Sequence, residues 1–264
     1  MSLLNKVITE ITPVSADVTA ETQKHLDNLI KPIGSLGKLE EIAVRISSIT
    51  GKVTNKLEKK CVVVFASDNG ICEEGVSTAP SVITAVQTLN MTKGLAGINV
   101  LSKQAGSDVY LVDIGVNADL PYEKIIDKKI RRGTRNMLHE PAMTREETIQ
   151  AIELGIMMVE DLAAKGYQVI GTGEMGIGNT STSGAIIMCL TGQSAEDVIG
   201  KGAGMTEADY RHKQNILKAA VAKHRPNPED PIDVLGKVGG YDIAGIAGIF
   251  LGCAYYKIPV VIDG

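Results

Sequence analysis

The sequence lacks tryptophan and contains only two phenylalanines among its 264 residues. It also lacks any uninterrupted run of three or more lysine or arginine residues, and its formal net charge is −4. A protein that binds nucleic acid usually presents a basic patch or aromatic side chains on which bases stack. The longest charge-free apolar stretch runs from residue 243 to residue 256 and is too short to span a bilayer. We therefore expect neither a nucleic-acid partner nor a membrane partner.

Metal-ligand spacing is also missing. The four cysteines are far apart and form no Cys-x-x-Cys pair, and the four histidines show no spacing that would chelate an ion. Because no secretory signal is recognisable, we expect the cysteines to be free thiols in a reducing cytoplasm. The sequence thus predicts a cytoplasmic protein that uses no metal ion and no other cofactor.

Apolar runs alternate with helical stretches from residue 60 onward, a pattern typical of parallel α/β sheets. We predict a Rossmann-like parallel sheet with helices on both faces over residues 56–264. Two amphipathic helices near the N-terminus predict the first part of a small helical domain over residues 1–55. The predicted strands are 61–66, 109–112, 167–170 and 258–262, and single long helices are predicted over 80–105, 144–165 and 206–222.

A glycine-rich segment from Gly171 to Gly184 follows a predicted strand and precedes an apolar helical run. Glycines at 171, 173, 176 and 178 allow a ligand to approach the backbone closely. The polar residues 179–182 mark a helix start, where free N–H groups favour an anion, most often phosphate. The segment indicates a phosphate-binding loop, and the alternative is a tight strand-to-helix turn. Lys213 is expected to bind the negative charge of the phosphate, and the alternative is that it is a solvated surface lysine.

Each predicted strand ends at an acid beside a glycine: Asp68, Asp113, Glu174 and Asp263. Because the carboxyl ends of parallel strands meet at one edge of a sheet, these acids are expected on the rim of one cleft. There they can hold ribose hydroxyls, stabilise a cation or take a proton. The alternative is that each acid only favours the start of the next helix.

The segment 171–176 also matches the Gly-x-Gly-x-x-Gly fingerprint of dinucleotide-binding proteins. The strand and acid expected about twenty residues later are missing. The paired acids typical of diphosphate-using phosphoribosyltransferases are missing as well. These absences favour a mononucleotide ligand and rank an NAD-dependent oxidoreductase low.

Several long blocks along the chain carry a resemblance to a known family: Lys31-Pro-Ile-Gly-Ser-Leu-Gly-Lys-Leu-Glu40, Gly75-Val-Ser-Thr-Ala-Pro80 with Val82-Ile-Thr-Ala-Val-Gln87, Gly173-Glu-Met-Gly-Ile-Gly-Asn-Thr180, Asp230-Pro-Ile-Asp-Val-Leu235 with Val238-Gly-Gly240, and Pro259-Val-Val-Ile-Asp-Gly264. In their order and spacing they resemble the nicotinate-nucleotide:dimethylbenzimidazole phosphoribosyltransferase family. The resemblance implies transfer of the 5-phosphoribosyl group of nicotinate mononucleotide to 5,6-dimethylbenzimidazole or a related base. The implied products are nicotinate and α-ribazole 5′-phosphate, for the lower loop of cobalamin. The resemblance also implies a homodimer that needs no metal.

By the same resemblance, Asp263 and Glu174 are the expected catalytic residues. Asp263 is expected near the ribose carbon, which gains positive charge as nicotinate leaves. The base is expected to contact Gln87, Ala79 and Met175. The expected nucleotide and phosphate contacts are Gly176, Ile177, Gly178, Asn179, Thr180, Gly202, Ala203 and Lys213.

The sequence departs from the family at three places. The family commonly has Asp-His-Gly where this chain has Asp68-Asn69-Gly70, and some members carry serine at the position of Ala79. Both changes concern which base is accepted, so a phenol, adenine or plain benzimidazole stays open. The family also continues past Asp-Gly to a Gly-Glu-Gly-Ser/Thr-Gly segment, whose glutamate is its proposed general base. We expect a truncated form; otherwise Glu174 or Asp263 supplies the base, or the protein is an inactive form or a non-catalytic nucleotide-binding subunit.

Overall fold

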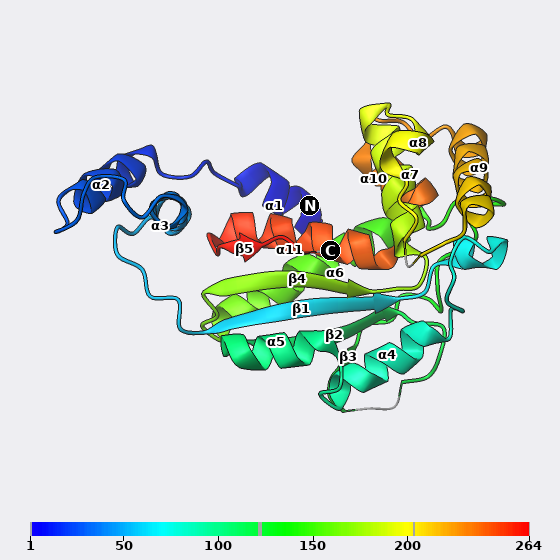
Figure 1. The fold of residues 1–264 in the computed structure, drawn as a ribbon, viewed down its shortest axis with the longest axis horizontal. Helices are drawn as coiled ribbons and strands as arrows, with labels where there is room; N and C mark the ends of the chain where they lie inside the picture. The colour runs from blue at the N-terminus through cyan, green and yellow to red at the C-terminus, as the bar shows by residue number, and fades with distance from the viewer. Residues whose placement is uncertain (1, 121–122, 203, 264) are drawn as a thin grey trace.

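The computed structural model of the protein describes residues 2–120, 123–202 and 204–263. Five strands form one sheet in the order β3-β2-β1-β4-β5, and every neighbouring pair is parallel (Figure 1). The predicted α/β class with a parallel sheet is thus confirmed. The strands are β1 (Lys60–Ser67), β2 (Asp108–Gly115), β3 (Ile125–Asp127), β4 (Val169–Met175) and β5 (Val260–Val261).

Helices cover both faces of the sheet (Figure 1). On one face, α6 and α11 pack so closely that a Cβ added to Gly248 would lie 2.0 Å from the carbonyl oxygen of Ile152. The α6 helix begins with the predicted capping box, in which the Thr144 hydroxyl accepts from the N–H of Glu147. The helices of the two faces are α4 (Ile83–Thr92) and α5 (Gly97–Ala105) on one side, and α6 (Arg145–Ala164) and α11 (Tyr241–Tyr256) on the other.

The N-terminal helices divide between two places. The helices α2 (Ala16–Asp27) and α3 (Lys38–Thr50) pack against each other beyond the amino end of β1 (Figure 1). The first helix, α1 (Leu3–Glu10), packs instead on α6 and α11, and its Leu4 and Val7 are buried in the core of the sheet domain. A small helical unit built from residues 1–55 stays a prediction.

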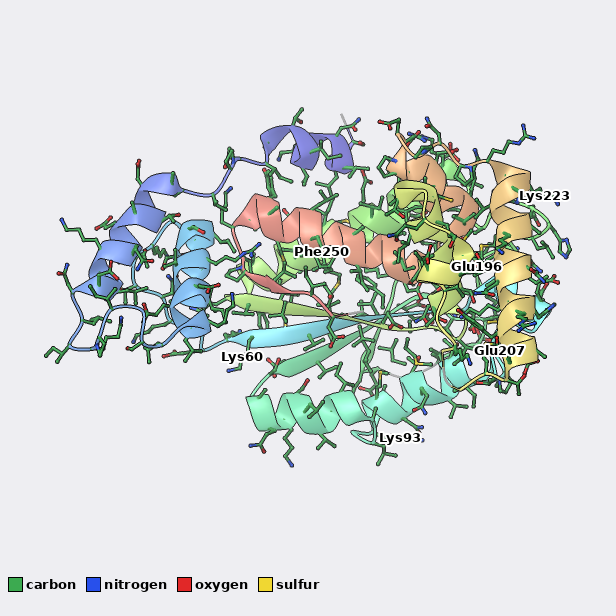
Figure 2. All side chains as sticks on the ribbon, turned by 45° about the horizontal axis from the view of Figure 1, so that its top comes forward. Lys60, Lys93, Glu196, Glu207, Lys223 and Phe250 are labelled. Atoms are coloured by element: carbon green, nitrogen blue, oxygen red, sulfur yellow. The ribbon has the colours of Figure 1, made fainter. Side chains whose placement is uncertain are left out.

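The remaining helices gather at the carboxyl end of the strands (Figure 1). In Figure 2, Glu196, Glu207 and Lys223 lie at this end of the sheet, whereas Lys60, the first residue of β1, lies at its amino end. The carboxyl end of a parallel sheet is where ligands bind in α/β proteins. The segments there are the 3-10 helix η1 (Gly70–Glu74) and the helices α7 (Asn179–Thr191), α8 (Ala195–Val198), α9 (Glu207–His224) and α10 (Pro231–Val238).

Two predicted element limits were wrong. The strand expected over 167–170 extends to Met175, so Gly171 and Gly173 lie inside β4. A Cβ added to them would touch the side chains of Val62 and Val64 at 3.2 and 3.3 Å, which shows that these glycines serve packing against β1. The single helix expected over 80–105 is two helices, because the chain turns at Gly94 with a φ of 77°.

The three-residue β3 was not predicted at all, since it is too short to show a hydrophobic period. Within residues 2–120, 123–202 and 204–263, no helix is both long and apolar enough to cross a bilayer.

Candidate active site

A short loop, residues 176–178, connects β4 to α7 at the carboxyl end of the sheet. Gly178 has a φ of 91°, in the left-handed region that favours glycine. Because this N-cap residue has no side chain, no side-chain oxygen caps the first turn of α7, and the N–H of Thr180 has no backbone acceptor. Those groups and the helix dipole favour an anion. This phosphate loop, as we name residues 176–178, contains three of the predicted phosphate contacts and is shorter than the sequence suggested.

Gly176 is required by close backbone contact. A Cβ at this position would lie 2.5 Å from the carbonyl oxygen of Ser67 and 2.6 Å from Oδ2 of Asp242. We expect Gly176→Ala to displace the phosphate loop, to destabilise the protein by about 1–3 kcal/mol and to weaken binding of a nucleoside 5′-monophosphate about 10-fold. Urea denaturation and titration calorimetry measure the two effects. The control is Gly97→Ala on α5, where an added Cβ meets nothing within 4 Å; equal effects of both changes would contradict the crowding argument.

A buried lysine stands beside the first turn of α7. Lys213, from α9, is only 1% exposed, and its Nζ lies 2.9 Å from Oγ1 of Thr180. A Cβ added to Gly202 would lie 3.9 Å from the same hydroxyl, so these three predicted contacts come together. The fourth residue of this group, Ala203, lies outside the described residues.

Lys213 has no carboxylate partner among the described residues, where every ion pair involves other cations. Burial lowers its pKa below the ordinary value for lysine, because a charge is poorly solvated there. A buried ammonium group that lacks an acid is stabilised when an anion binds beside it. The alternative of a solvated surface lysine is therefore wrong.

Two acids lie near the ends of the neighbouring strands β4 and β5. Glu174, near the end of β4, accepts a hydrogen bond from the side-chain amide of Asn179. Asp263 follows β5, where its backbone N and O are bonded to Oγ1 of Thr172 at 3.1 and 2.7 Å. Burial, and then the negative charge of Asp263, raise the pKa of Glu174 above the ordinary value for glutamate. A carboxylate of this kind can accept a proton or stabilise a nearby cation.

A third acid, Asp242, was missed by the sequence analysis. It lies in the first turn of α11, is 0% exposed, and its Oδ2 has no hydrogen-bond partner among the described residues. Burial, and then the charge of Glu174, raise the pKa of Asp242 to about 7. One sequence feature could have revealed Asp242: it directly precedes the apolar run 243–256, so its charged side chain lies where the chain enters the core.

We expect Asp242→Asn to flatten the pH dependence of stability. Between the ordinary pKa of 3.8 and about 7 the native protein holds a proton that the unfolded chain has lost, so the free energy of unfolding falls as the pH rises. Across this pH interval the free energy of unfolding of the wild type falls by roughly 4 kcal/mol because of Asp242, and this fall is absent in Asp242→Asn. Urea denaturation across this pH range measures it. Equal slopes for the two proteins would show that Asp242 does not hold this proton.

The predicted base contacts come from three segments. Met175 is the last residue of β4, and Gln87 lies on α4. Ala79 lies between η1 and α4 and lines a cavity of about 720 Å³ at the carboxyl end of β1. Of the three described residues, only Ala79 lines this cavity. The structure therefore does not gather the three residues around this one cavity.

The other two predicted rim acids have structural contacts. Asp113 lies inside β2, where its carboxylate pairs with Lys129 at 3.1 Å and accepts the N–H of Val116 at 2.9 Å. Asp68 accepts the N–H of Asn117 at 2.7 Å. These contacts hold the loops after β1 and β2, and the carboxylate of Asp113 already has a cation partner; one functional rim of four acids stays a prediction.

The fold and the site define a class of protein: an α/β protein with a phosphate loop, a buried lysine and a pair of acids at the carboxyl end of its sheet. A family model described as "Phosphoribosyltransferase" matches residues 11–264. The chain is thus a phosphoribosyltransferase by family, and the comparisons with individual proteins make the family more specific.

A nicotinate-nucleotide–dimethylbenzimidazole phosphoribosyltransferase from Clostridium tetani is 50% identical over 264 residues, which are 100% of this chain and 73% of that protein. A protein of the same name from Geobacter sp. (strain M21) is 50% identical over 100% of this chain and 76% of its own length. The crystal structure of CobT from Thermus thermophilus matches with a TM-score of 0.89 at 37% identity, over 94% of this chain and 74% of that one. The chain belongs to the nicotinate-nucleotide–dimethylbenzimidazole phosphoribosyltransferase family, and the resemblance found in the sequence is confirmed.

Proposed function

We propose that the protein transfers the 5-phosphoribosyl group of nicotinate mononucleotide to 5,6-dimethylbenzimidazole or a related base. The bond between the ribose carbon and the nicotinate nitrogen breaks, and nicotinate leaves with the electron pair. A nitrogen of the base forms the new bond and the base loses a proton. The products are α-ribazole 5′-phosphate, nicotinate and that proton. Family membership and the contact of Lys213 with Thr180 beside the phosphate loop support this reaction.

The nucleotide is held by its 5′-phosphate in this proposal. The N–H groups of Gly178 and Thr180 and the ammonium group of Lys213 bind the phosphate, since neither kind of donor has an anionic partner in the described residues. Gly202 allows close approach beside Thr180. The phosphate would then be fixed at the end of β4, with its ribose beside Glu174.

Asp263 and Glu174 have different roles in the proposed reaction. Asp263 faces the ribose carbon and stabilises the positive charge that develops as nicotinate departs. Glu174 accepts the proton of the attacking base, and its raised pKa suits it to that task near neutral pH. Ala79, Gln87 and Met175 contact the flat base. No metal ion and no other cofactor takes part.

The test is to incubate the purified protein with nicotinate mononucleotide and dimethylbenzimidazole and to follow both products by liquid chromatography. Equal amounts of nicotinate and α-ribazole 5′-phosphate are expected. Parallel reactions with adenine, a phenol and plain benzimidazole define the base. Binding of the nucleotide without product from any base would indicate the non-catalytic nucleotide-binding subunit instead.

We further propose that the protein is a cytoplasmic homodimer. Support for the dimer comes from exposed apolar side chains on α4, α5 and their connection, among them Val86, Leu95, Val100 and Leu101. Support for the compartment comes from the four free cysteines, which are typical of reducing surroundings. The molar mass in solution, measured by light scattering, tests the dimer.

A further inference from the structure

The backbone N–H and C=O of Ile177, in the middle of the phosphate loop, are both bonded to side chains of one distant segment. The N–H donates to Oγ1 of Thr84 at 3.0 Å. The carbonyl oxygen accepts from Nδ2 of Asn69 at 3.3 Å and from Sγ of Cys72 at 3.1 Å. All three side chains lie between the end of β1 and the first turn of α4, so one segment supplies these three hydrogen bonds.

We propose that Thr84, Asn69 and Cys72 are positioning residues that fix the phosphate loop in its nucleotide-binding form. We call these three residues the Ile177 clamp. The inference rests on the proposed function, because it assumes that residues 176–178 bind the phosphate of the nucleotide. Asn69 and Cys72 also line the cavity that Ala79 lines, but the hydrogen bonds of all three side chains to Ile177 make each of them act on the nucleotide through the loop.

Burial makes these contacts strong determinants of the loop position. Thr84 is 0% exposed and Asn69 is 2% exposed. Water therefore cannot replace these side chains as hydrogen-bond partners of the Ile177 N–H and carbonyl oxygen. A buried N–H that loses its acceptor costs more than an ordinary hydrogen bond contributes, and the loop would turn to recover it. The loop conformation that faces the phosphate therefore depends on the hydroxyl of Thr84.

Cys72 donates a hydrogen bond to the Ile177 carbonyl oxygen and also limits the space beneath Gly178. Burial raises the pKa of its thiol to about 11, so the thiol keeps the proton that it donates to Ile177. A Cβ added to Gly178 would lie 2.5 Å from its sulfur, which shows how closely the side chain packs under the loop. Asn69 stands where the family commonly has histidine, so this chain uses an amide as the second donor.

The clamp also connects the two substrates. Thr84 and Gln87 lie three residues apart on α4, which places them on the same face of the helix. Ala79 lies on the segment between Cys72 and Thr84. If the segment from Cys72 to Gln87 moves when the base binds, the side chains bonded to Ile177 move with it. If the phosphate loop moves, the base contacts on this segment are displaced in turn.

The experiment measures the affinity of the whole protein for nicotinate mononucleotide by titration calorimetry, without a base. Thr84→Val removes the hydroxyl at nearly constant volume and is expected to weaken binding about 10-fold, whereas Thr84→Ser restores it to within about 2-fold. Cys72→Ala and Cys72→Ser form a second pair, in which Cys72→Ala loses affinity and Cys72→Ser, which keeps a donor, loses less. In steady-state assays Thr84→Val raises the KM for the nucleotide more than it lowers kcat.

The matched control is Thr92→Val, the same change at a buried threonine of α4 whose hydroxyl donates to Leu89 within its own helix. Thermal melts without nucleotide report the folding of each variant. Folded Thr84→Val and Cys72→Ala proteins that bind as tightly as the wild type overturn the clamp, as does an equal loss in Thr92→Val. If Thr84→Val does not fold, the Cys72 pair decides. A wild-type protein that does not bind nicotinate mononucleotide refutes the proposed function itself, which is a separate result.

Discussion

Replacing Lys213 by methionine is expected to weaken the binding of nicotinate mononucleotide by about 100-fold, or about 2.7 kcal/mol. The ammonium group is buried beside Thr180 with no carboxylate partner in the described part of the chain, so a bound phosphate is the anion that it can neutralise. Methionine keeps the length of the side chain and removes the charge. Titration calorimetry with the nucleotide measures the loss.

The same change is expected to raise the melting temperature of the ligand-free protein. A buried, unpaired charge costs stability, and an apolar side chain of similar volume removes that cost. The control is Lys218→Met on the same helix, since Lys218 is paired with Glu196 at the surface. This control should alter neither quantity appreciably. A Lys213→Met protein that binds the nucleotide normally would contradict the phosphate assignment.

Replacing Glu174 by glutamine is expected to lower kcat by about 10² to 10⁴-fold, the usual contribution of a general base. Glutamine keeps the size of the side chain and can still bond to Asn179, so the affinity for the nucleotide should change little. The assay follows release of nicotinate under saturating substrates. A large loss of affinity with an unchanged kcat would indicate that Glu174 binds the ribose and takes no proton.

The pH profile supplies a second signature for Glu174. A general base works as the carboxylate, so the rate of the wild type falls as the pH drops through the pKa of Glu174. Because burial raises that pKa, the fall begins at a higher pH than for an ordinary glutamate. In Glu174→Gln this limb should disappear. The control is Glu229→Gln, which changes an exposed acid outside the candidate site and should keep the wild-type pH profile.

The parts of the fold that follow from local patterns were predictable. The apolar run 61–66 became the central strand, and the capping box at Thr144 marked the start of α6. The loop between β4 and α7 was predictable because glycine and a helix start are both visible in sequence, whereas its binding of phosphate stays a prediction. The limits of the loop were not predictable, because glycines that fit under Val62 and Val64 look the same in sequence as glycines that admit a ligand.

The missed residues depend on tertiary contacts. Asp242 becomes unusual only when α11 packs against α6 and carries its carboxylate under the phosphate loop. Thr84 and Cys72 look like ordinary helix and loop residues until the segment after β1 meets Ile177, which is 93 and 105 positions away from them in sequence. Asn69 was noticed only as a departure from the family, and no pattern revealed its contact with the loop.

The strand order has a consequence for how the protein is made. Lys60 of β1 pairs with Val169 of β4, while the other edge of β1 pairs with the earlier strand β2. On the ribosome, a nascent chain therefore leaves the backbone N–H and C=O groups on one edge of its central strand unpaired until β4 has been translated. Open edges of this kind recruit other chains. Chaperone capture of the growing polypeptide should accordingly peak before β4 leaves the exit tunnel and decline once it has docked.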